Sequence, residues 1–381
     1  MTERSTFSRR DTLVHLAATA AALGGATGPA RAAGKAIRIG STLAQTGIEL
    51  ANGTGLTLGA TAFFTALNKA GGVNGNKVEL VLADDQFDPE KAKQNALAFA
   101  ADPSIVGILH PLGTRQTAAV MDNAPNVPVV GPNTGTVALR KKDARNVFWV
   151  RANYDQEIEK LINTASTLGT SRIALVHPKD PLGLSLLAGF EAAMARHNLK
   201  PVVIATTPNT TSTEVEPAAA EIAKVAPQLV IMGLGATMPH FVKAARKAGV
   251  TSTMYGLSIA PNIQNIRALG DMTRGLGFSI VVPTPFTPKH EIVRRYRADM
   301  EAMGSSDLSL VSLEGYINAR VLTEGLRRAG ANPTRESLHA GLEGLGTLDL
   351  GGLRLSFGKG DHEGSNFVDL AVIGPDSKLM T

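Results

Sequence analysis

The most constraining feature of the sequence is residues 71–94, where a helix stop, a turn, a strand and a new helix follow one another. Gly71-Gly72 end a helical pattern, and Asn74-Gly75 is a turn pair that tolerates positive φ. Residues 78–82 alternate and are rich in β-formers. An Asp-Pro-Glu run then gives an N-cap, a proline at the first helical position and an acid in the first turn. The segment is typical of a strand–loop–helix unit of an α/β sheet.

Similar units precede and follow this segment, so we expect a parallel sheet covered by helices on both faces. The strands of this first lobe are expected at 36–43, 78–82, 105–109, 127–130 and 147–150. A glycine-rich stretch, 47–59, separates the first strand from a helix expected at 61–69. The same alternation restarts near residue 152, with strands expected at 172–176, 202–206, 229–232, 254–256 and 278–281. The pattern therefore predicts two similar α/β lobes.

The last hundred residues show fewer strand–helix alternations. A proline-rich segment, 283–288, is expected to return the chain from the second lobe to the first. Two long helices are expected at 313–329 and 335–345. A hairpin-like pair of strands, 353–357 and 367–373, is expected to close the chain.

The first 33 residues are predicted to be an export signal. Arg9-Arg10 precede an apolar run, 13–23, and Ala30-Arg31-Ala32 follows as a cleavage pattern. The paired arginines resemble the twin-arginine signal, which predicts a protein that folds before export. A cytosolic amphipathic helix is the alternative interpretation of this stretch. We therefore expect a periplasmic protein whose mature chain begins near Ala33 or Gly34.

Composition excludes several functional classes. The chain contains 0 Cys, which rules out a disulfide, a thiolate metal site and a cysteine nucleophile. The net charge of +5 comes without any long basic run, so a nucleic-acid partner is not expected. Gly53-x-Gly55-x-x-x-Gly59 does not have the dinucleotide-binding spacing, and no P-loop is present. No G-x-S-x-G elbow and no pair of His residues at i, i+4 occurs, so we expect no cofactor, no metal and no catalysis.

Asp84-Asp85, at the end of the second strand, could in principle be a carboxylate pair for acid–base chemistry. Adjacent strand residues point to opposite faces, however, so only one of the two could face a cleft. Capping and hydrogen bonding beside a cleft is the favoured interpretation.

Polar residues also follow several other strands of the predicted sheets. Ligands bind at the carboxyl ends of strands in open α/β sheets, and two facing lobes form a cleft that closes by hinge motion. Hydroxyls, amides and glycine N–H groups suit a small polar ligand that is bound without chemistry. The strand-end candidates are Gln45, Gly113, Thr114, Arg115, Asn133, Thr134, Gly135, Tyr154 and Asp180.

Several longer runs resemble a known family. These are IRIGSTLAQTG, ALNKAGGVNGNKVELVLADDQFDPEKA, VPVVGPNTG, FVKAARKAGV and LEGYINARVLTEGLRRAG. They are similar to the type I periplasmic substrate-binding proteins of ABC transporters, in the branched-chain amino acid (Leu/Ile/Val-binding) group. The resemblance implies two Rossmann-like lobes joined by three crossovers. It places the first lobe at 34–151 plus 283–358 and the second at 152–282 plus 359–381.

The resemblance also implies positions for ligand contacts. The loop after the third strand, which holds a ligand carboxylate in the family, corresponds to Gly113-Thr114, with Arg115 as an additional cation. The loop after the fourth strand corresponds to 133–135, where the usual threonine position falls on Gly135. The remaining family positions fall on residues of other types here. Aromatic positions fall on Asn52, Leu182 and near Gly235, and the acid that pairs with a ligand ammonium falls on Ser258.

These departures leave two kinds of ligand open. For an amino acid, Glu314 or Asp180 would replace the missing acid, because an unpaired buried ammonium is costly. For a carboxylate without an ammonium, Arg115 or Arg151 would be the partner. The predicted function is an extracytoplasmic receptor that closes on such a ligand and delivers it to an ABC permease. A non-transport ligand sensor of the same fold is the alternative, and an exported enzyme ranks third.

Overall fold

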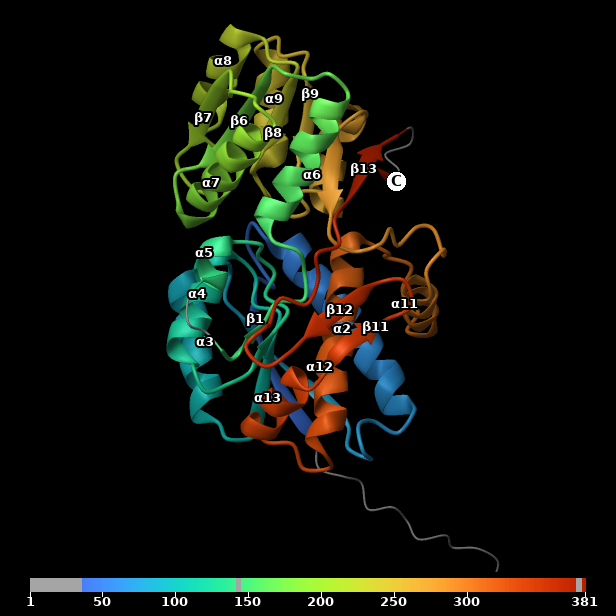
Figure 1. Cartoon of the computed structure of the whole chain (residues 1–381). Coiled ribbons are helices and arrows are strands. Elements are labelled where there is room, and N and C mark those ends of the chain that lie inside the picture. Colours follow the sequence, from blue (N-terminus) through green and yellow to red (C-terminus); the bar gives the residue numbers. More distant parts are fainter. Residues whose placement is uncertain (1–35, 142–144, 375–378) are drawn as a thin grey trace, which may run out of the picture. The chain divides into compact units, whose positions relative to one another are not determined.

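The computed structural model describes residues 36–141, 145–374 and 379–381, so the predicted export signal lies outside the described residues. The fold is α/β with two lobes, each built on a mainly parallel sheet, as the sequence predicts (Figure 1). None of the described helices is long and apolar enough to cross a membrane.

The first lobe contains a five-stranded sheet in the order β2-β1-β3-β4-β5, with all neighbours parallel. Its strands are β1 (Ile37–Leu43), β2 (Val78–Asp84), β3 (Ile105–Leu109), β4 (Val129–Val130) and β5 (Val147–Phe148). Its helices are α2 (Leu50–Lys69), α3 (Pro89–Ala101), α4 (Thr114–Asn123) and α5 (Val137–Arg140). Helices α3 and α4 pack on one face and α2 on the other, which covers both faces of the sheet.

The second lobe contains a seven-stranded sheet in the order β14-β13-β10-β9-β8-β6-β7. Its strands are β6 (Ile173–Pro178), β7 (Val203–Thr207), β8 (Leu229–Met232), β9 (Thr253–Gly256), β10 (Gly277–Ile280), β13 (Asp369–Ile373) and β14 (Leu379–Met380). Its helices are α6 (Tyr154–Thr167), α7 (Pro181–Arg196), α8 (Glu216–Val225), α9 (Met238–Lys247) and α10 (Ile263–Leu269), with a 3₁₀ turn at Gly270–Thr273. Strands β6–β10 are parallel, while β13 and β14 add an antiparallel edge.

The remaining elements return to the first lobe. They are α11 (Glu291–Ala302), α12 (Leu310–Ala329), α13 (Arg335–Glu343) and the hairpin of β11 (Gly346–Asp349) with β12 (Arg354–Phe357). Their apolar residues join one core with β1 and α2. The predicted hairpin between 353–357 and 367–373 is wrong, because β12 pairs with β11 and β13 pairs with β10 and β14. Gly351 and Gly352, both at positive φ, make the turn that closes the actual hairpin.

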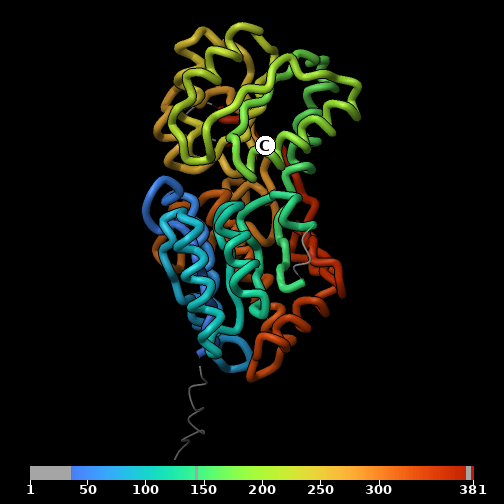
Figure 2. Tube along the Cα trace, turned by 90° about the vertical axis from the view of Figure 1, so that its left-hand side faces the viewer, coloured from blue at the N-terminus to red at the C-terminus, as the bar shows by residue number. Residues whose placement is uncertain are grey.

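The chain passes three times between the two sheets: from β5 to α6, from β10 to α11, and from β12 to β13. In Figure 2 these connections can be followed as the green, orange and red segments of the trace. The predicted residue boundaries of the lobes are not tested by this path and stay a prediction.

Helix α2 begins at Leu50, earlier than the expected start at 61, so the glycine-rich stretch is helical. Its glycines are needed for close packing. A Cβ on Gly53 would lie 1.6 Å from the Ala44 carbonyl oxygen, and one on Gly59 would lie 1.7 Å from the Ser312 carbonyl oxygen. The contact is similarly close from the side of α12, where a Cβ on Gly315 would lie 2.2 Å from the Leu56 carbonyl oxygen. Tertiary packing thus outweighs the low helix propensity of glycine.

This contact gives the first testable prediction. Gly59→Ala should lower the free energy of unfolding by about 1–3 kcal/mol or more, because α2 and α12 must move apart. Urea unfolding followed by circular dichroism measures the change. Thr61→Ala, at an exposed position of the same helix, is the control and should be neutral or slightly stabilising. A Gly59→Ala protein as stable as the wild type would contradict the close contact.

Candidate ligand-binding site

A cavity of about 130 Å³ lies between strand-end loops of both sheets. For comparison, an engineered cavity of about 150 Å³ holds one benzene molecule. The first lobe contributes Glu49, Asn52, Phe87, Leu112, Gly113, Thr114, Arg115, Gln116 and Asn133 to its wall. The second lobe contributes Tyr154, Asp180, Leu182, Asn209, Thr210, Thr211, Gly235 and Ile259. The cavity therefore has room for a small molecule, and most of the residues in its wall are of polar types.

Most of the sequence-predicted contact residues meet in this cavity. Those in its wall are Asn52, Gly113, Thr114, Arg115, Asn133, Tyr154, Leu182 and Gly235. Those outside its wall are Gln45, Thr134, Gly135 and Ser258. Gln45 instead stabilises the loop after β1. Its backbone N–H donates to Asp84 over 2.8 Å, and its side chain donates to Thr57 over 3.0 Å.

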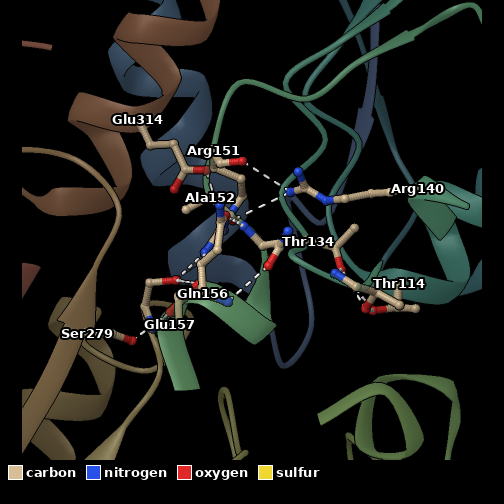
Figure 3. A network of polar contacts seen from close by, with 12 residues as sticks. Thr114, Thr134, Arg140, Arg151, Ala152, Gln156, Glu157, Ser279 and Glu314 are labelled. Carbon is tan, nitrogen blue, oxygen red and sulfur yellow. Dashed lines mark hydrogen bonds and ion pairs between the residues drawn. The ribbon is translucent and has the colours of Figure 1, made fainter. Parts of the chain in front are cut away.

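Three threonine hydroxyls form a buried cluster behind one wall of the cavity. The Thr114 hydroxyl lies 2.9 Å from that of Thr134 and 2.8 Å from that of Thr136, and the last two are 3.1 Å apart. Figure 3 shows Thr114 and Thr134 near the neighbouring charged network. Next to the cluster, the Gly135 carbonyl accepts a hydrogen bond of 2.8 Å from the Tyr154 N–H. Thr134 and Gly135 thus support Thr114 and Tyr154, which are part of the wall.

The amino end of α4 forms part of this wall. Gly113 precedes the helix with φ of 97°, a conformation that favours glycine, and Thr114 is the first helical residue. The first N–H groups of a helix lack intrahelical acceptors and carry partial positive charge, so they bind anions well. The exposed Arg115 adds a full positive charge beside them. This wall is suited to a carboxylate.

The acidic end of β2 shapes the adjoining loop. Asp84 accepts hydrogen bonds from the N–H groups of Gln45 (2.8 Å) and Gln86 (2.9 Å). Asp85 is fully buried, and it accepts hydrogen bonds from the Thr42 hydroxyl (3.0 Å) and the Phe87 N–H (2.9 Å). These contacts hold Phe87 in the cavity wall. The predicted hydrogen bonding beside a cleft is confirmed, because the two carboxylates organise the loop while Phe87 reaches the cavity. The cap of α3 is Asp88 and neither of these two acids.

Glu49 forms an acidic corner of the cavity that the sequence reasoning missed. The residue is 5% exposed, and its carboxylate accepts hydrogen bonds from Asn52 Nδ2 (2.6 Å) and the Ala236 N–H (3.3 Å). Among the described residues, no Lys, Arg or His forms an ion pair with it. Burial raises the pKa of the Glu49 carboxyl to about 7, against the two hydrogen bonds that lower it. The corner thus holds a carboxylate whose negative charge is costly without a cation.

Asn52 adds a second unsatisfied acceptor to this corner. Its Nδ2 faces two acceptors, Glu49 Oε2 at 2.6 Å and the Ile259 carbonyl at 3.4 Å, which fixes the orientation of the amide. The amide oxygen Oδ1 is then buried without a hydrogen-bond donor. A donor group in the cavity would satisfy it. Glu49 directly precedes α2, and nothing in its local sequence distinguishes it from a surface acid.

Asp180 and the loop after β7 complete the second lobe's side. One Asp180 oxygen accepts a hydrogen bond from the Gly183 N–H (3.2 Å), and the other accepts from the N–H (2.8 Å) and hydroxyl of Thr210. These bonds cap α7 and fix the loop that contributes Thr210 to the cavity. Asp180 is therefore already saturated by the protein, unlike Glu49.

A buried ion-pair network lies where the chain first passes between the sheets (Figure 3). Arg151 lies 3.1 Å from Glu157 on α6 and 3.4 Å from Glu314 on α12, and it also bonds the Ser258 hydroxyl. Its side chain is 2% exposed. Ser258 and Ser279 both donate to Glu157, over 2.9 and 2.6 Å. The network thus joins elements of both lobes around one guanidinium.

This network argues against two of the ligand partners that the sequence left open, Arg151 for a carboxylate and Glu314 for an ammonium. Arg151 is occupied by two carboxylates, so it is not available to a ligand carboxylate. Glu314 is occupied by Arg151 and lies outside the cavity wall, so it does not replace the missing ammonium partner. Burial raises the pKa of the Glu314 carboxyl, while Arg151 lowers it. The sequence could not show these pairings, because they join residues far apart in the chain.

Removing the guanidinium should be strongly destabilising. Arg151→Met leaves Glu157 and Glu314 buried without a cation, which should cost about 3–5 kcal/mol in the free energy of unfolding. Arg196→Met breaks an ion pair with Glu159 that is largely exposed, and should cost less than about 1 kcal/mol. Urea unfolding of both variants near neutral pH measures the difference. Equal losses in the two variants would show that the buried network is not special.

Glu49 should give the ligand-free protein a pH dependence of known sign. With a pKa of about 7 when folded and an ordinary value near 4.5 when unfolded, it keeps a proton that the unfolded chain releases between these pH values. Stability from this group is therefore lost as pH rises across that window. Glu49→Gln should gain up to about 3 kcal/mol relative to the wild type at pH near 8, and little near pH 4.5.

Urea unfolding of wild type and variant at several pH values measures this difference. Asp85, whose pKa burial raises to about 6, titrates in both proteins and cancels in the comparison. A stability difference between the two proteins that does not change with pH would rule out a buried, proton-binding Glu49.

Comparisons with known proteins identify the family of the chain and support its overall fold. Over residues 36–378 the sequence matches the family described as periplasmic binding protein. A substrate-binding periplasmic protein from Ralstonia solanacearum is 31% identical with a TM-score of 0.84, covering 90% of this chain and 99% of that chain. A possible leucine/isoleucine/valine-binding protein from Rhodopirellula baltica is 25% identical with a TM-score of 0.86, covering 93% and 98%.

Leu/Ile/Val-binding protein homolog 3 from Brucella melitensis is 28% identical over 178 residues, which is 46% of this chain and 48% of that relative. The matched stretch thus spans about half the length of the curated relatives. The resemblance seen in the sequence is confirmed by the family match over almost all described residues. The chain belongs to the periplasmic binding protein family, a family of ligand-binding proteins and not of enzymes.

Proposed function

We propose that this protein is an extracytoplasmic receptor for a small α-amino acid, which it holds between its lobes and delivers to an ABC permease. The observation that carries this proposal is the acidic corner of the cavity. Glu49 and the Asn52 amide oxygen are two buried acceptors that lack a cationic donor among the described residues. An ammonium group supplies the charge and the N–H donors that both require.

The amino end of α4 offers positive charge for the other end of such a ligand. A ligand carboxylate fits the N–H groups of the first helical turn, with Arg115 nearby to add positive charge. A ligand that carries both an ammonium and a carboxylate would use both ends of this polar wall. The volume of about 130 Å³ favours a small side chain. The Leu/Ile/Val-binding description of the Brucella melitensis relative supports the same class of ligand.

Closure of the lobes accounts for capture. The Glu49 carboxylate accepts a hydrogen bond from the Ala236 N–H, and Asn52 donates to the Ile259 carbonyl, so both bonds join the two lobes beside the cavity. An ammonium bound at Glu49 would strengthen this contact and favour the closed form. Hinge closure is thus coupled to the ligand at the Glu49 corner of the cavity.

Export by the twin-arginine route, inferred from Arg9-Arg10, is part of the same proposal.

Matched ligand pairs test this function. Alanine, valine and leucine should each raise the Tm of the mature protein more than propanoate, 3-methylbutanoate and 4-methylpentanoate, which lack only the amino group. Binding stabilises the folded state by an amount that grows with the logarithm of the ratio of ligand concentration to Kd, so at equal ligand concentration the Tm difference reports the contribution of the ammonium. Glu49→Gln should weaken amino-acid binding at least about 10-fold, as calorimetry measures, because a charge-assisted bond becomes neutral.

Two further variants locate the other end of the ligand. Thr114→Ala should weaken binding, since it removes the hydroxyl that fixes the first turn of α4. Thr54→Ala removes a hydroxyl on α2 that donates to the Leu50 carbonyl outside the cavity wall, and should leave affinity unchanged. Equal binding of the acids without an amino group would contradict the ammonium site. Unchanged binding by Thr114→Ala would contradict the placement of the carboxylate.

A further inference from the structure

A cluster of two histidines and a glutamate lies in the first lobe, away from the ligand cavity. His339 and Glu343 are one turn apart on α13, and His362 lies in the segment that leads from β12 toward β13. His339 Nδ1 is 3.8 Å from Glu343 Oε2, and His362 Nε2 is 3.2 Å from Glu343 Oε1. All three donor atoms lie within 4.8 Å of one another.

The remaining ring nitrogens determine which atoms carry protons. His339 Nε2 lies 2.8 Å from the Arg145 carbonyl oxygen, and His362 Nδ1 lies 3.1 Å from the Val147 carbonyl oxygen. A carbonyl only accepts hydrogen bonds, so these two nitrogens are the N–H donors. In a neutral imidazole the other nitrogen then has a lone pair. In the neutral form of both rings these lone pairs therefore face the Glu343 carboxylate, and three groups able to bind a cation lie close together.

Packing fixes the rings in this arrangement. The His362 ring stacks on Phe148 with centroids 4.1 Å apart, and the His339 ring meets the edge of Phe148 at 5.4 Å. The His362 side chain is 9% exposed, whereas those of Glu343 and His339 are 23% and 30% exposed. The cluster is therefore held from the protein side and open to solvent on the other. Histidines whose second N–H is bound by a carbonyl are the usual form of metal ligands.

We propose that His339 Nδ1, His362 Nε2 and Glu343 form a binding site for a zinc-like divalent transition metal. Imidazole and carboxylate ligands suit Zn²⁺, with a water molecule as the fourth ligand, and they suit Mg²⁺ or Ca²⁺ poorly. Bonds of about 2.0–2.1 Å imply ligand separations of roughly 3.3 Å in a tetrahedral site. The two His–Glu separations are close to this value, so small side-chain rotations complete the site.

The position of the cluster indicates what the metal would do. The His362 carbonyl accepts the Trp149 N–H over 2.8 Å, and the next residue, Glu363, bonds Arg140 over 2.9 Å. The first bond ties the third crossing segment to the first crossing segment, and the second ties it to α5. A metal that bridges His362 and α13 would anchor this pair of crossing segments to the first lobe. It would stabilise the fold without occupying the ligand cavity.

Metal titration of untagged, chelator-treated protein tests the proposal. Calorimetry with Zn²⁺ alone should show one equivalent bound, and Co²⁺ should give the visible absorption of a low-symmetry site. Saturating Zn²⁺ should raise the Tm by about 2–4 °C or more. Glu343→Gln preserves shape and hydrogen bonding but removes the anionic ligand, so it should fold normally and lose at least about 10-fold in Zn²⁺ affinity. His362→Asn should lose the site as well.

The matched control is His197→Asn. His197 Nε2 lies 2.7 Å from Glu159 Oε1, but this pair has no second histidine among the described residues. Zn²⁺ binding by this variant should equal that of the wild type. Absence of Zn²⁺ binding by the wild type would overturn the proposal. The cluster would then be a hydrogen-bonded His–Glu group without a metal. Binding that survives Glu343→Gln, or that is lost equally in His197→Asn, would also overturn it.

Discussion

The buried guanidinium of Arg151 is the interaction on which the two-lobe arrangement most depends. It follows β5 directly, at the first passage between the sheets, and it contacts acids from α6 and α12. A charge in such a place must be paired, so any movement of the lobes has to keep at least one of these contacts. A hinge motion that keeps Arg151 paired would therefore rotate about this residue. Arg140 adds to this restriction, since it donates to the carbonyls of Arg151 and Ala152.

The cavity differs from this network in how its buried charge is paired. At the hinge each buried charge has partners, whereas at Glu49 the protein buries a carboxylate without a cation. The ionised form of such a group lowers the stability of the empty protein, and in the proposed function the ligand ammonium would offset this cost. Functional sites commonly retain this type of local cost. The difference between the two acidic sites separates the structural acids, Glu157 and Glu314, from the acid that faces the cavity.

The fold was largely predictable from the sequence because its signals are local. Alternating strands and helix caps, such as the Asp88 cap of α3, predict the lobes without distant contacts. The errors in the predicted fold came from tertiary contacts: the glycines of α2 pack against α12, and β12 pairs with β11.

For the site, the strand-end loops predicted that Thr114, Asn133 and Tyr154 would lie in the cavity wall. Nothing local distinguished Glu49 from a surface acid, and the His339–His362 cluster joins residues on different elements.

The raised pKa of Glu49 has a consequence for the proposed ligand binding. If the empty protein carries a proton on this carboxyl near neutral pH and the bound ammonium requires the ionised form, then each binding event expels a proton. Capture and release of the solute would then be chemically linked to the acidity of the surrounding compartment. Acidification would favour the empty receptor, and the heat of binding would depend on the ionisation enthalpy of the buffer. A single unpaired carboxylate would thus make a transport receptor also a responder to proton concentration.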